Sequence, residues 1–310
     1  MYISRFFNTL MGYLPGTQRY AKKTTHVGTS LLAFLLLVTI GSESYADELA
    51  KQPAPNDYLQ SKESTKLPNA PYVWERESGK KHLVVLGTYH LLNPHAPMYQ
   101  RMAAIFDRVQ PQFILHESLA PDDLATETRD QAIRRGADLG FTVQLARQLG
   151  VPTESADAPA QAELTELLAH HLAKDVFVYL VATRLVGSYR NPDLKEAASE
   201  YPSFFHTQII GYGVPVQQGW ETWDGFLREY RQVTGQSVTA KTWDPRRLDP
   251  TLKMGRLNEV ARTSDSLRDR YVLAAIRKSL RSYDRVMVVF GAAHVIALEP
   301  ALGELFKDGH

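Results

Sequence analysis

The sequence predicts an α/β fold: a parallel or mixed central sheet, flanking helices, and a helical, aromatic-rich insert over the carboxyl ends of the strands. Two apolar runs, residues 82–86 and 286–290, have the character of buried strands. After the first run, residues 98–109 repeat apolar side chains at helical spacing, and residues 113–115 form another short apolar run. Strand, helix and strand in this order predict a βαβ unit with parallel strands.

Residues 1–46 have the layout of a secretory signal peptide. A basic stretch with Arg19 and Lys22 precedes an apolar run that ends at Ile40, and Ser44 and Ala46 supply small residues for a cleavage site. The apolar run is shorter than the roughly 20 residues that a spanning helix needs. We therefore expect export with cleavage, to the periplasm or outside the cell. In the alternative, an uncleaved leader would anchor the protein to the membrane.

Residues 47–72 are polar and contain prolines, which predicts a linker. Residues 73–310 are expected to form a single α/β domain, with the helical insert at about residues 160–250. Clustered aromatic side chains in the insert favour a packed core over a binding surface. Further helices are expected at residues 138–149, 163–185, 266–280 and 295–306, and short strands at residues 72–76 and 151–153.

The composition narrows the classes of function. A net charge of +1, without a dense stripe of Lys and Arg, argues against a nucleic-acid partner. The chain has no cysteine, so it cannot form a disulfide or a thiolate metal site. Any metal would have to be held by histidine and carboxylate groups, which suit divalent ions such as Zn, Mn or Co.

Both long apolar runs are followed by a Gly-x-x-His motif. Gly87 and His90 follow the first run, and Gly291 and His294 follow the second. Ligands of parallel sheets bind outside the carboxyl ends of the strands, so both histidines should reach one rim. Glycine lets the chain turn sharply there and lets another group come close. One copy would indicate an ordinary buried histidine, whereas two copies indicate a functional site.

Two carboxylates are expected at the same rim. Glu117 follows the strand at residues 113–115, and Glu154 follows the next short strand. His116 alternates with Glu117 and should face the opposite way, into the packing. Two imidazoles and one carboxylate form a typical ligand set for a catalytic divalent metal, which predicts His90, Glu117 and His294 as metal ligands. Glu154 would act as a general base or orient a ligand.

The same residues also support a reaction without a metal. A histidine oriented by Glu117 would activate water directly, and an arginine would hold the developing oxyanion. Ion pairing with a basic residue is the structural alternative for Glu117 and for Glu154. Both catalytic readings predict hydrolysis.

The order of these motifs resembles the TraB/GumN/TIKI-type proteins, which are related to erythromycin esterases and to ChaN-like haem-binding lipoproteins. A further match is the segment from Arg268 to Tyr271, which is similar to an Arg-Asn/Asp helix motif before the final Gly-x-x-His of that group. The resemblance covers roughly residues 80–124 and 262–306. It implies that the active-site residues are His90, Glu117, Arg268 and His294.

The resemblance implies hydrolysis of a carbonyl-centred bond. TIKI members are metal-dependent proteases with two Gly-x-x-His motifs and a glutamate, and erythromycin esterases hydrolyse a lactone with a similar set. We therefore expect an exported hydrolase of a peptide or a small-molecule ester, with Arg268 stabilising negative charge. The ChaN-like relatives imply the alternative, a protein that binds haem, iron or a small ligand without catalysis. Two positions depart from the pattern of that group. Asp269 stands where many members have Asn, and Glu154 lacks the usual glycine neighbour.

Overall fold

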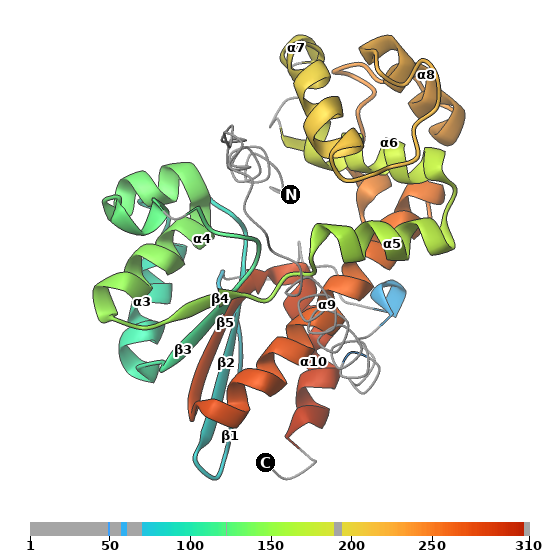
Figure 1. Ribbon diagram of the computed structural model, residues 1–310. Helices are drawn as coiled ribbons and strands as arrows, with labels where there is room; N and C mark the ends of the chain where they lie inside the picture. The colour runs from blue at the N-terminus through green and yellow to red at the C-terminus, as the bar shows by residue number, and fades with distance from the viewer. Residues whose placement is uncertain (1–48, 50–56, 61–69, 122, 189–193, 307–310) are drawn as a thin grey trace, which may run out of the picture.

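The computed structural model describes residues 49, 57–60, 70–121, 123–188 and 194–306 (Figure 1). The predicted signal peptide, residues 1–46, lies outside the described residues. Within the part of the chain that is described, no helix is both long enough and apolar enough to cross a membrane. The centre of the fold is a five-stranded mixed sheet with helices on both faces, which confirms the predicted α/β class.

The strands lie in the order β1-β2-β5-β3-β4. The first pair is antiparallel, between β1 (Tyr72–Ser78) and β2 (Lys81–Thr88). The other pairs are parallel and involve β5 (Arg285–Gly291), β3 (Phe113–His116) and β4 (Thr153–Ser155). The last of the described strands, β5, is therefore the central one, and its carboxyl end lies between those of β2 and β3.

Alternate residues of β2 pack against different helices. Leu83 and Val85 belong to a core formed with α9 and α10, whereas Val84 and Leu86 belong to a core formed with α3 and α4 (Figure 1). Burial on both faces explains why the strand is an unbroken apolar run rather than an alternating one. The four helices span Pro97–Val109 (α3), Arg129–Leu149 (α4), Arg256–Ser282 (α9) and Ala292–Leu305 (α10).

Two of these helices begin earlier than the sequence predicted. A capping box at Thr128 starts α4, so the helix begins before the predicted residue Asp138. A kink at Ala137 (φ 47°, ψ −130°) divides α4 into this earlier part and the predicted part. The expected left-handed C-cap at Gly150 is present. The helix predicted at residues 266–280 is the second part of the longer α9.

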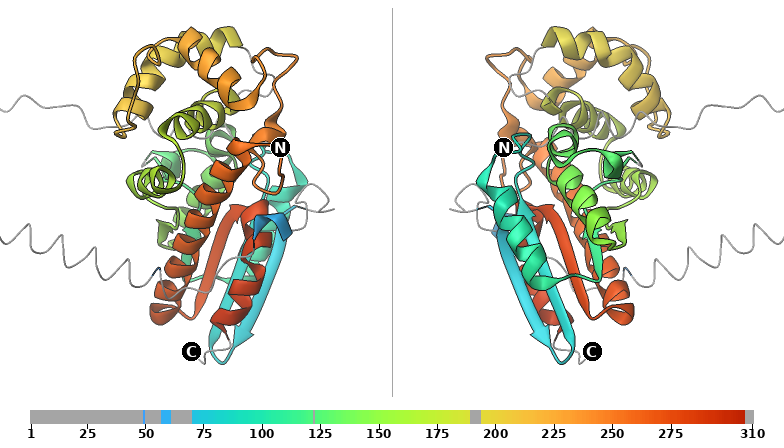
Figure 2. Two further views of the ribbon diagram at one scale, coloured as in Figure 1. Left: turned by 90° about the vertical axis from the view of Figure 1, so that its right-hand side faces the viewer. Right: turned by 90° about the vertical axis from the view of Figure 1, so that its left-hand side faces the viewer.

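The insert stands at the carboxyl ends of the strands (Figures 1 and 2). The predicted helix at residues 163–185 is two helices, because the backbone is extended at His171. Phe177 stacks on Trp220 with ring centroids 4.2 Å apart, which confirms that the aromatic side chains form a core. The segments are α5 (Ala160–His170), α6 (Ala173–Arg184), α7 (Leu194–Phe204), the π-helix η5 (Phe205–Ile210) and α8 (Trp223–Thr234).

Several short helical turns complete the described chain. They are η1 (Tyr58–Gln60), η3 (Leu124–Thr126), η4 (Val186–Ser188) and η6 (Pro245–Leu248). The first of them falls within residues 47–72, for which we predicted a linker. Tyr58 is only 1% exposed, so at this residue the predicted linker packs against the domain.

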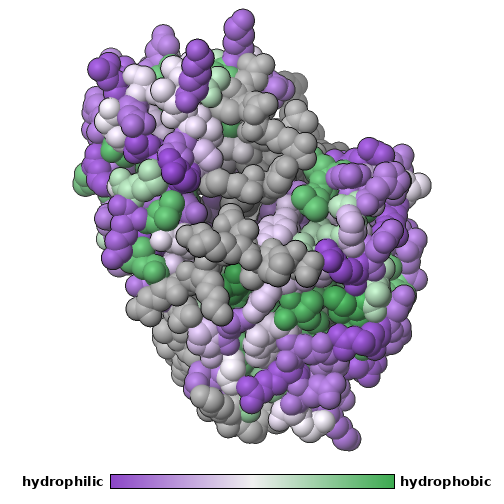
Figure 3. Space-filling model, turned by 180° about the vertical axis from the view of Figure 1, so that it is seen from behind, coloured by the Kyte–Doolittle hydropathy of each residue, from purple (hydrophilic) through white to green (hydrophobic). Residues whose placement is uncertain are grey.

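On the face shown in Figure 3, the coloured residues are mostly hydrophilic, and hydrophobic residues form smaller groups among them. The large hydrophobic side chains that are exposed in the described chain come from many different elements. They are Val73, Leu119, Leu149, Leu172, Ile210, Val216 and Met254. Isolated exposed side chains of this kind are normal for a globular protein.

Candidate functional site

The carboxyl ends of β2, β3 and β5 bring together three of the predicted residues. His90 follows β2, Glu117 follows β3 directly, and His294 lies in the first turn of α10, which begins at the end of β5. Nε2 of His90 lies 3.7 Å from Oε2 of Glu117. Arg268 reaches the same place from α9. We call His90, Glu117, Arg268 and His294 the rim site.

Gly291 leaves space at the centre of the rim site. Its backbone N–H donates to Oε2 of Glu117 over 2.7 Å. A Cβ atom at position 291 would lie 3.6 Å from Nε2 of His90 and 3.6 Å from Cδ2 of His294. The missing side chain therefore leaves a gap about the size of one methyl group, and both imidazole rings border it. The other motif glycine, Gly87, permits close packing instead, because its Cβ would lie 2.9 Å from Cα of Ala292.

Arg268 forms the basic centre of the rim site. Its Nη2 donates to Oε1 of Glu117 over 2.7 Å, and its Nε donates to Oδ1 of Asp157 over 2.7 Å. Burial lowers the pKa of Arg268, but the charges of Asp157 and Glu117 raise it well above its ordinary value. Burial also raises the pKa of Glu117, but the charges of Arg268 and His90 lower it to about 2. Arg268 and Glu117 therefore both stay charged at neutral pH.

A buried aspartate holds His90. Oδ1 of Asp138 lies 2.6 Å from Nδ1 of His90, and the Thr88 hydroxyl donates to Oδ2 of the same carboxylate over 2.5 Å. Burial lowers the pKa of His90, but the charge and hydrogen bond of Asp138 and the charge of Glu117 raise it to about 9. Asp138 opens the second half of α4, where the helix dipole favours a negative charge.

His294 is held in the same way. Oδ1 of Asp269, which is fully buried, lies 2.7 Å from Nδ1 of His294. Burial lowers the pKa of His294, but the charges of Asp269 and Asp265 raise it to about 9 against the opposing charge of Arg268. Nη1 of Arg268 lies 3.1 Å from Nε2 of His294. Since Nδ1 of each ring faces an aspartate, Nε2 of each ring is directed toward the Arg268–Glu117 pair.

Asp265 is a further acid beside the rim site. It lies one helical turn before Asp269 in α9, with Oδ1 3.8 Å from Nη1 of Arg268 and 3.9 Å from Nε2 of His294. Burial raises the pKa of Asp265 to about 6, although the charges of His294 and Arg268 lower it. Asp265 therefore takes up a proton at a higher pH than Glu117 does.

Strained backbone surrounds the rim site. Among the described non-glycine residues, His90 (φ 44°), Ser118 (φ 64°) and Ala137 (φ 47°) have positive φ. His90 belongs to the rim site, Ser118 follows Glu117, and Ala137 precedes Asp138. Such conformations cost of order 1–3 kcal/mol each and concentrate where geometry serves a function. The fourth described case, Gln110, ends a helix.

The structure does not bring Glu154 to the rim site. Its side chain is 55% exposed, and Oε1 lies 3.5 Å from Nζ of Lys278. Glu154 therefore forms an ion pair with a basic residue, which was the alternative to a role in the site. Asp157, shortly after β4, reaches the site in its place. His116 is buried as expected, and its Nδ1 lies 3.0 Å from the carbonyl oxygen of Ser118.

Sequence reasoning did not assign a role to five residues that contact the rim site. Asp157 could have been found, because it follows its strand as His90 follows β2. Asp265 and Asp269 share a helix with Arg268, so the spacing of one turn was a usable signal. The sequence pattern at Asp138 predicted only the start of a helix. Tyr58 lies in a segment whose composition predicted a linker.

The donor atoms at the rim site do not fit the predicted metal. Oε1 of Glu117 accepts from Arg268, Oε2 accepts from the Gly291 N–H, and Nε2 of His294 faces the Arg268 guanidinium. Both oxygens of Glu117 are therefore occupied by N–H donors, and the guanidinium charge beside Nε2 of His294 opposes a cation there. Ligation by these three residues would require Arg268 to leave, and it stays a prediction.

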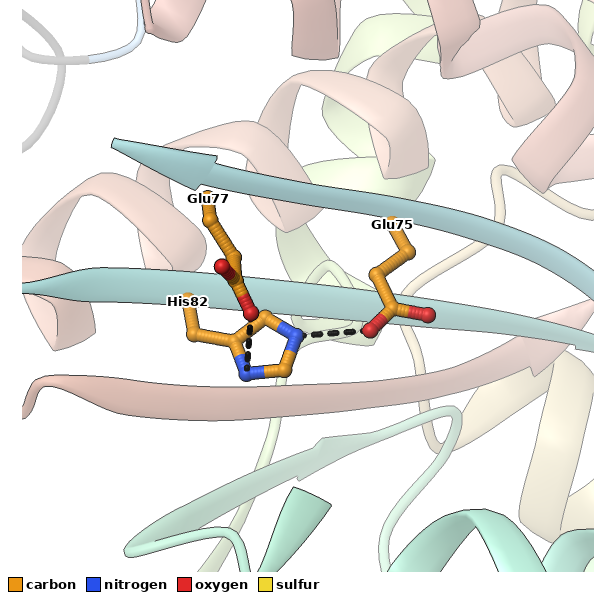
Figure 4. A group of neighbouring side chains, drawn as sticks. All are labelled: Glu75, Glu77 and His82. Atoms are coloured by element: carbon orange, nitrogen blue, oxygen red, sulfur yellow. Dashed lines mark hydrogen bonds and ion pairs between the residues drawn. The ribbon is translucent and has the colours of Figure 1, made fainter. Parts of the chain in front are cut away.

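One group in the described chain has metal-ligand spacing, and it lies elsewhere. It consists of Glu75, Glu77 and His82 on the β1–β2 hairpin (Figure 4). Arg108 donates to both carboxylate oxygens of Glu75 over 2.6 and 2.7 Å, and its hydrogen bond is the main cause that lowers the pKa of Glu75 to about 2. A bidentate ion pair therefore satisfies Glu75, and His82 lies 2.8 Å from Glu75 and 3.6 Å from Glu77.

Comparisons of the chain with known protein families, with curated proteins and with solved structures found no match. The resemblance to TraB/GumN/TIKI-type proteins stays a prediction, and the function must be argued from the rim site itself.

Proposed function

We propose that the protein is a hydrolase of a carbonyl-centred bond, a peptide or an ester, in which His90 and His294 act as an acid–base pair. One observation carries the proposal. Each imidazole has Nδ1 held by a buried aspartate, and both rings border the gap at Gly291. A carboxylate partner fixes the tautomer and orientation of a catalytic histidine. Two such pairs around one gap suit a reaction that takes up a proton and returns one.

The reaction needs one neutral ring and one protonated ring. Because the pKa of each imidazole is about 9, both carry a proton most of the time at neutral pH. The contact with Arg268 favours His294 as the ring that turns neutral, because a proton on its Nε2 would face the guanidinium. His90, close to Glu117, is the ring that remains an imidazolium.

The chemical step balances with these groups. Arg268 Nη1 turns from Nε2 of His294 to the carbonyl oxygen of the substrate, which frees the Nε2 lone pair. Water then attacks the carbonyl carbon while Nε2 takes its proton, and the carbonyl oxygen becomes an oxyanion held by Arg268. The bond to the leaving group then breaks as His90 donates a proton to the departing oxygen or nitrogen. Positive charge placed where an oxyanion develops lowers the barrier by several kcal/mol in comparable sites. Glu117 orients Arg268 by its ion pair.

The experiment compares purified wild-type protein with His90→Gln and His294→Gln on a panel of peptides and aryl esters. His95→Gln is the matched control, because His95 is exposed in the loop after the same strand. We expect hydrolysis by wild type and His95→Gln, and a loss of at least about 100-fold in both rim-site variants. Equal activity in wild type and His90→Gln would contradict the proposal.

A chelation arm tests the metal-assisted alternative. We expect activity to survive dialysis against EDTA, because Arg268 occupies the position that a metal would take. Loss on chelation, with recovery on adding Zn, Mn or Co, would establish the metal-dependent version instead. A haem titration that gives an absorbance band in wild type but not in His294→Gln, without any hydrolysis, would favour the binding alternative. Export stays part of the proposal, to be tested by fractionation of cells that express the full chain.

A further inference from the structure

The segment at residues 57–60 reaches the rim site although it lies well before the first strand. Its Tyr58 hydroxyl donates to Oδ2 of Asp269 over 2.8 Å and lies 3.0 Å from Nδ1 of His294. The tyrosine ring meets the imidazole edge to face, with centroids 6.3 Å apart and an interplanar angle of 87°. We propose that Tyr58 is a positioning residue, which holds the Asp269–His294 pair in its working orientation; this role rests on the proposed hydrolytic function.

The hydrogen-bond balance supports the proposal. An ionised carboxylate only accepts, so the Tyr58 O–H must be the donor to Oδ2 of Asp269. The other oxygen, Oδ1, accepts from Nδ1–H of His294. Asp269 is 0% exposed, so the water that would otherwise satisfy its oxygens is excluded. Tyr58 thereby fixes the carboxylate, the carboxylate fixes the ring, and the ring directs Nε2 toward Arg268.

The other histidine has a counterpart arrangement. The Thr88 hydroxyl donates to Oδ2 of Asp138, whose Oδ1 holds Nδ1 of His90. Each imidazole is therefore the end of a chain that runs from hydroxyl to carboxylate to ring. Thr88 comes from the strand that carries His90, but Tyr58 comes from a separate segment. Of these two hydrogen-bonded chains, only the one that ends at His294 depends on a residue outside the sheet and the helices that pack on it.

Tyr58 acts through His294 and not on the substrate. Its side chain is buried at 1% exposure, on the Nδ1 edge of the ring that faces away from the gap at Gly291. Burial, followed by the charges of Asp269 and Asp265, raises the pKa of Tyr58 well above its ordinary value, so the hydroxyl keeps its proton and remains a donor. Removing the donor should make Asp269 more basic and raise the pKa of His294.

The test uses Tyr58→Phe in the full chain, which keeps the ring and removes the hydroxyl. Tyr283→Phe is the matched control, because this tyrosine stacks on Phe113 next to the beginning of β5, at the opposite end of that strand from His294. The first readout needs no substrate: an NMR titration of the histidine rings, with His294 assigned by comparison with His294→Gln. We expect the His294 pKa to rise by about half a unit or more in Tyr58→Phe and to stay unchanged in Tyr283→Phe.

The second readout uses the substrate found for the proposed function. We expect kcat to fall about tenfold in Tyr58→Phe with KM within a factor of about two, and the pH profile to move with the His294 pKa. If Tyr58→Phe does not fold, 3-fluorotyrosine at position 58 provides a second variant, since it keeps the ring and makes the hydroxyl a stronger donor. The His294 pKa should then fall.

The outcomes separate the two proposals. A shifted His294 titration without any hydrolysis would sustain the positioning role of Tyr58 and reject the proposed enzyme activity. Hydrolysis that is lost in His90→Gln but unchanged in Tyr58→Phe, together with an unchanged His294 titration, would overturn the role of Tyr58 and leave the enzyme standing.

Discussion

Nη1 of Arg268 lies 3.1 Å from Nε2 of His294, on the edge of the ring opposite Asp269. The imidazole is thus held between an anion at Nδ1 and a cation at Nε2. A proton on Nδ1 satisfies both contacts, whereas a proton on Nε2 would face a guanidinium N–H. When the ring is neutral, the arginine therefore favours the tautomer with the proton on Nδ1 and the lone pair on Nε2.

Arg268→Lys should damage both stability and activity. Lysine keeps the charge but cannot bridge Glu117, Asp157 and His294 at once, so buried carboxylates lose hydrogen bonds. We expect the free energy of unfolding to fall by about 3 kcal/mol and kcat to fall at least about 100-fold. Denaturant unfolding and steady-state kinetics measure these effects. The control is Arg270→Lys, because Arg270 forms a more exposed ion pair with Glu166. It should change the free energy of unfolding by less than about 0.5 kcal/mol. An equal loss of stability in the two variants would contradict the prediction for Arg268.

Gly291→Ala should abolish activity while the protein still folds. The added methyl group would enter the gap between the imidazole rings, 3.6 Å from each and 3.3 Å from Oε2 of Glu117. These contacts are tolerable for folding, so we expect the free energy of unfolding to change by less than about 1.5 kcal/mol. Gly303→Ala is the control, because nothing lies within 4 Å of its Cβ position in α10. Wild-type turnover by Gly291→Ala would show that the substrate does not use this gap.

Turnover should rise with pH up to about 9. The reactive form has one neutral and one protonated imidazole, and each pKa is about 9. Below that value the fraction of this form, and so kcat/KM, should increase about tenfold per pH unit, and above it the rate should fall. A profile of kcat/KM from pH 6 to 10.5 tests this. A plateau from pH 6.5 upward would mean that neither ring has a raised pKa.

Stability should decrease over the same pH range. Below pH 6.5 both imidazoles are protonated in the folded and in the unfolded chain, so their stabilisation is fully present. Between pH 6.5 and about 9 only the folded chain keeps these protons, and each histidine loses roughly 1.4 kcal/mol of stabilisation per pH unit as an upper value. Urea unfolding at pH 6, 7.5 and 9 measures the decline. His90→Gln should decline less steeply than wild type, and an equal slope would remove His90 as a cause.

Gly140→Ala should disrupt the kink that presents Asp138 to His90. A Cβ at position 140 would lie 1.9 Å from the carbonyl oxygen of Ala132, so the two halves of α4 would have to separate. We expect a loss of about 3 kcal/mol in the free energy of unfolding. Ala137→Gly is the opposite change, because glycine tolerates the positive φ at the kink, and it should gain about 1 kcal/mol. Thermal and urea unfolding of both variants would show whether they differ in sign.

The parts of the fold that the sequence predicted are those with a local signal. Continuous apolar runs identified β2, β3 and β5, and the rule that ligands gather at carboxyl ends correctly placed His90, Glu117 and His294 together. The resemblance added Arg268, which residue patterns alone would have left as an exposed helix charge. The structure buries it instead.

What the sequence could not show depends on long-range geometry. Asp138 is a site residue only because α4 kinks before it, and the kink depends on contact between Ala132 and Gly140. Glu154 lies within β4 and Asp157 lies two residues after it, and the direction of each side chain makes Glu154 exposed and Asp157 buried against Arg268. Tyr58 comes from a polar, proline-bearing segment whose composition resembles a linker. Composition reports the average character of a segment and not the contact of one side chain.

The position of β5 at the centre of the sheet sets the order in which this protein can mature. Until the ribosome has produced residues 285–294, β2 and β3 lack the neighbour that joins them, and both keep an unpaired edge. The same final stretch supplies Gly291 and His294. A chain that stops before residue 285 therefore lacks both the strand that joins the two halves of the sheet and two groups that border the rim site.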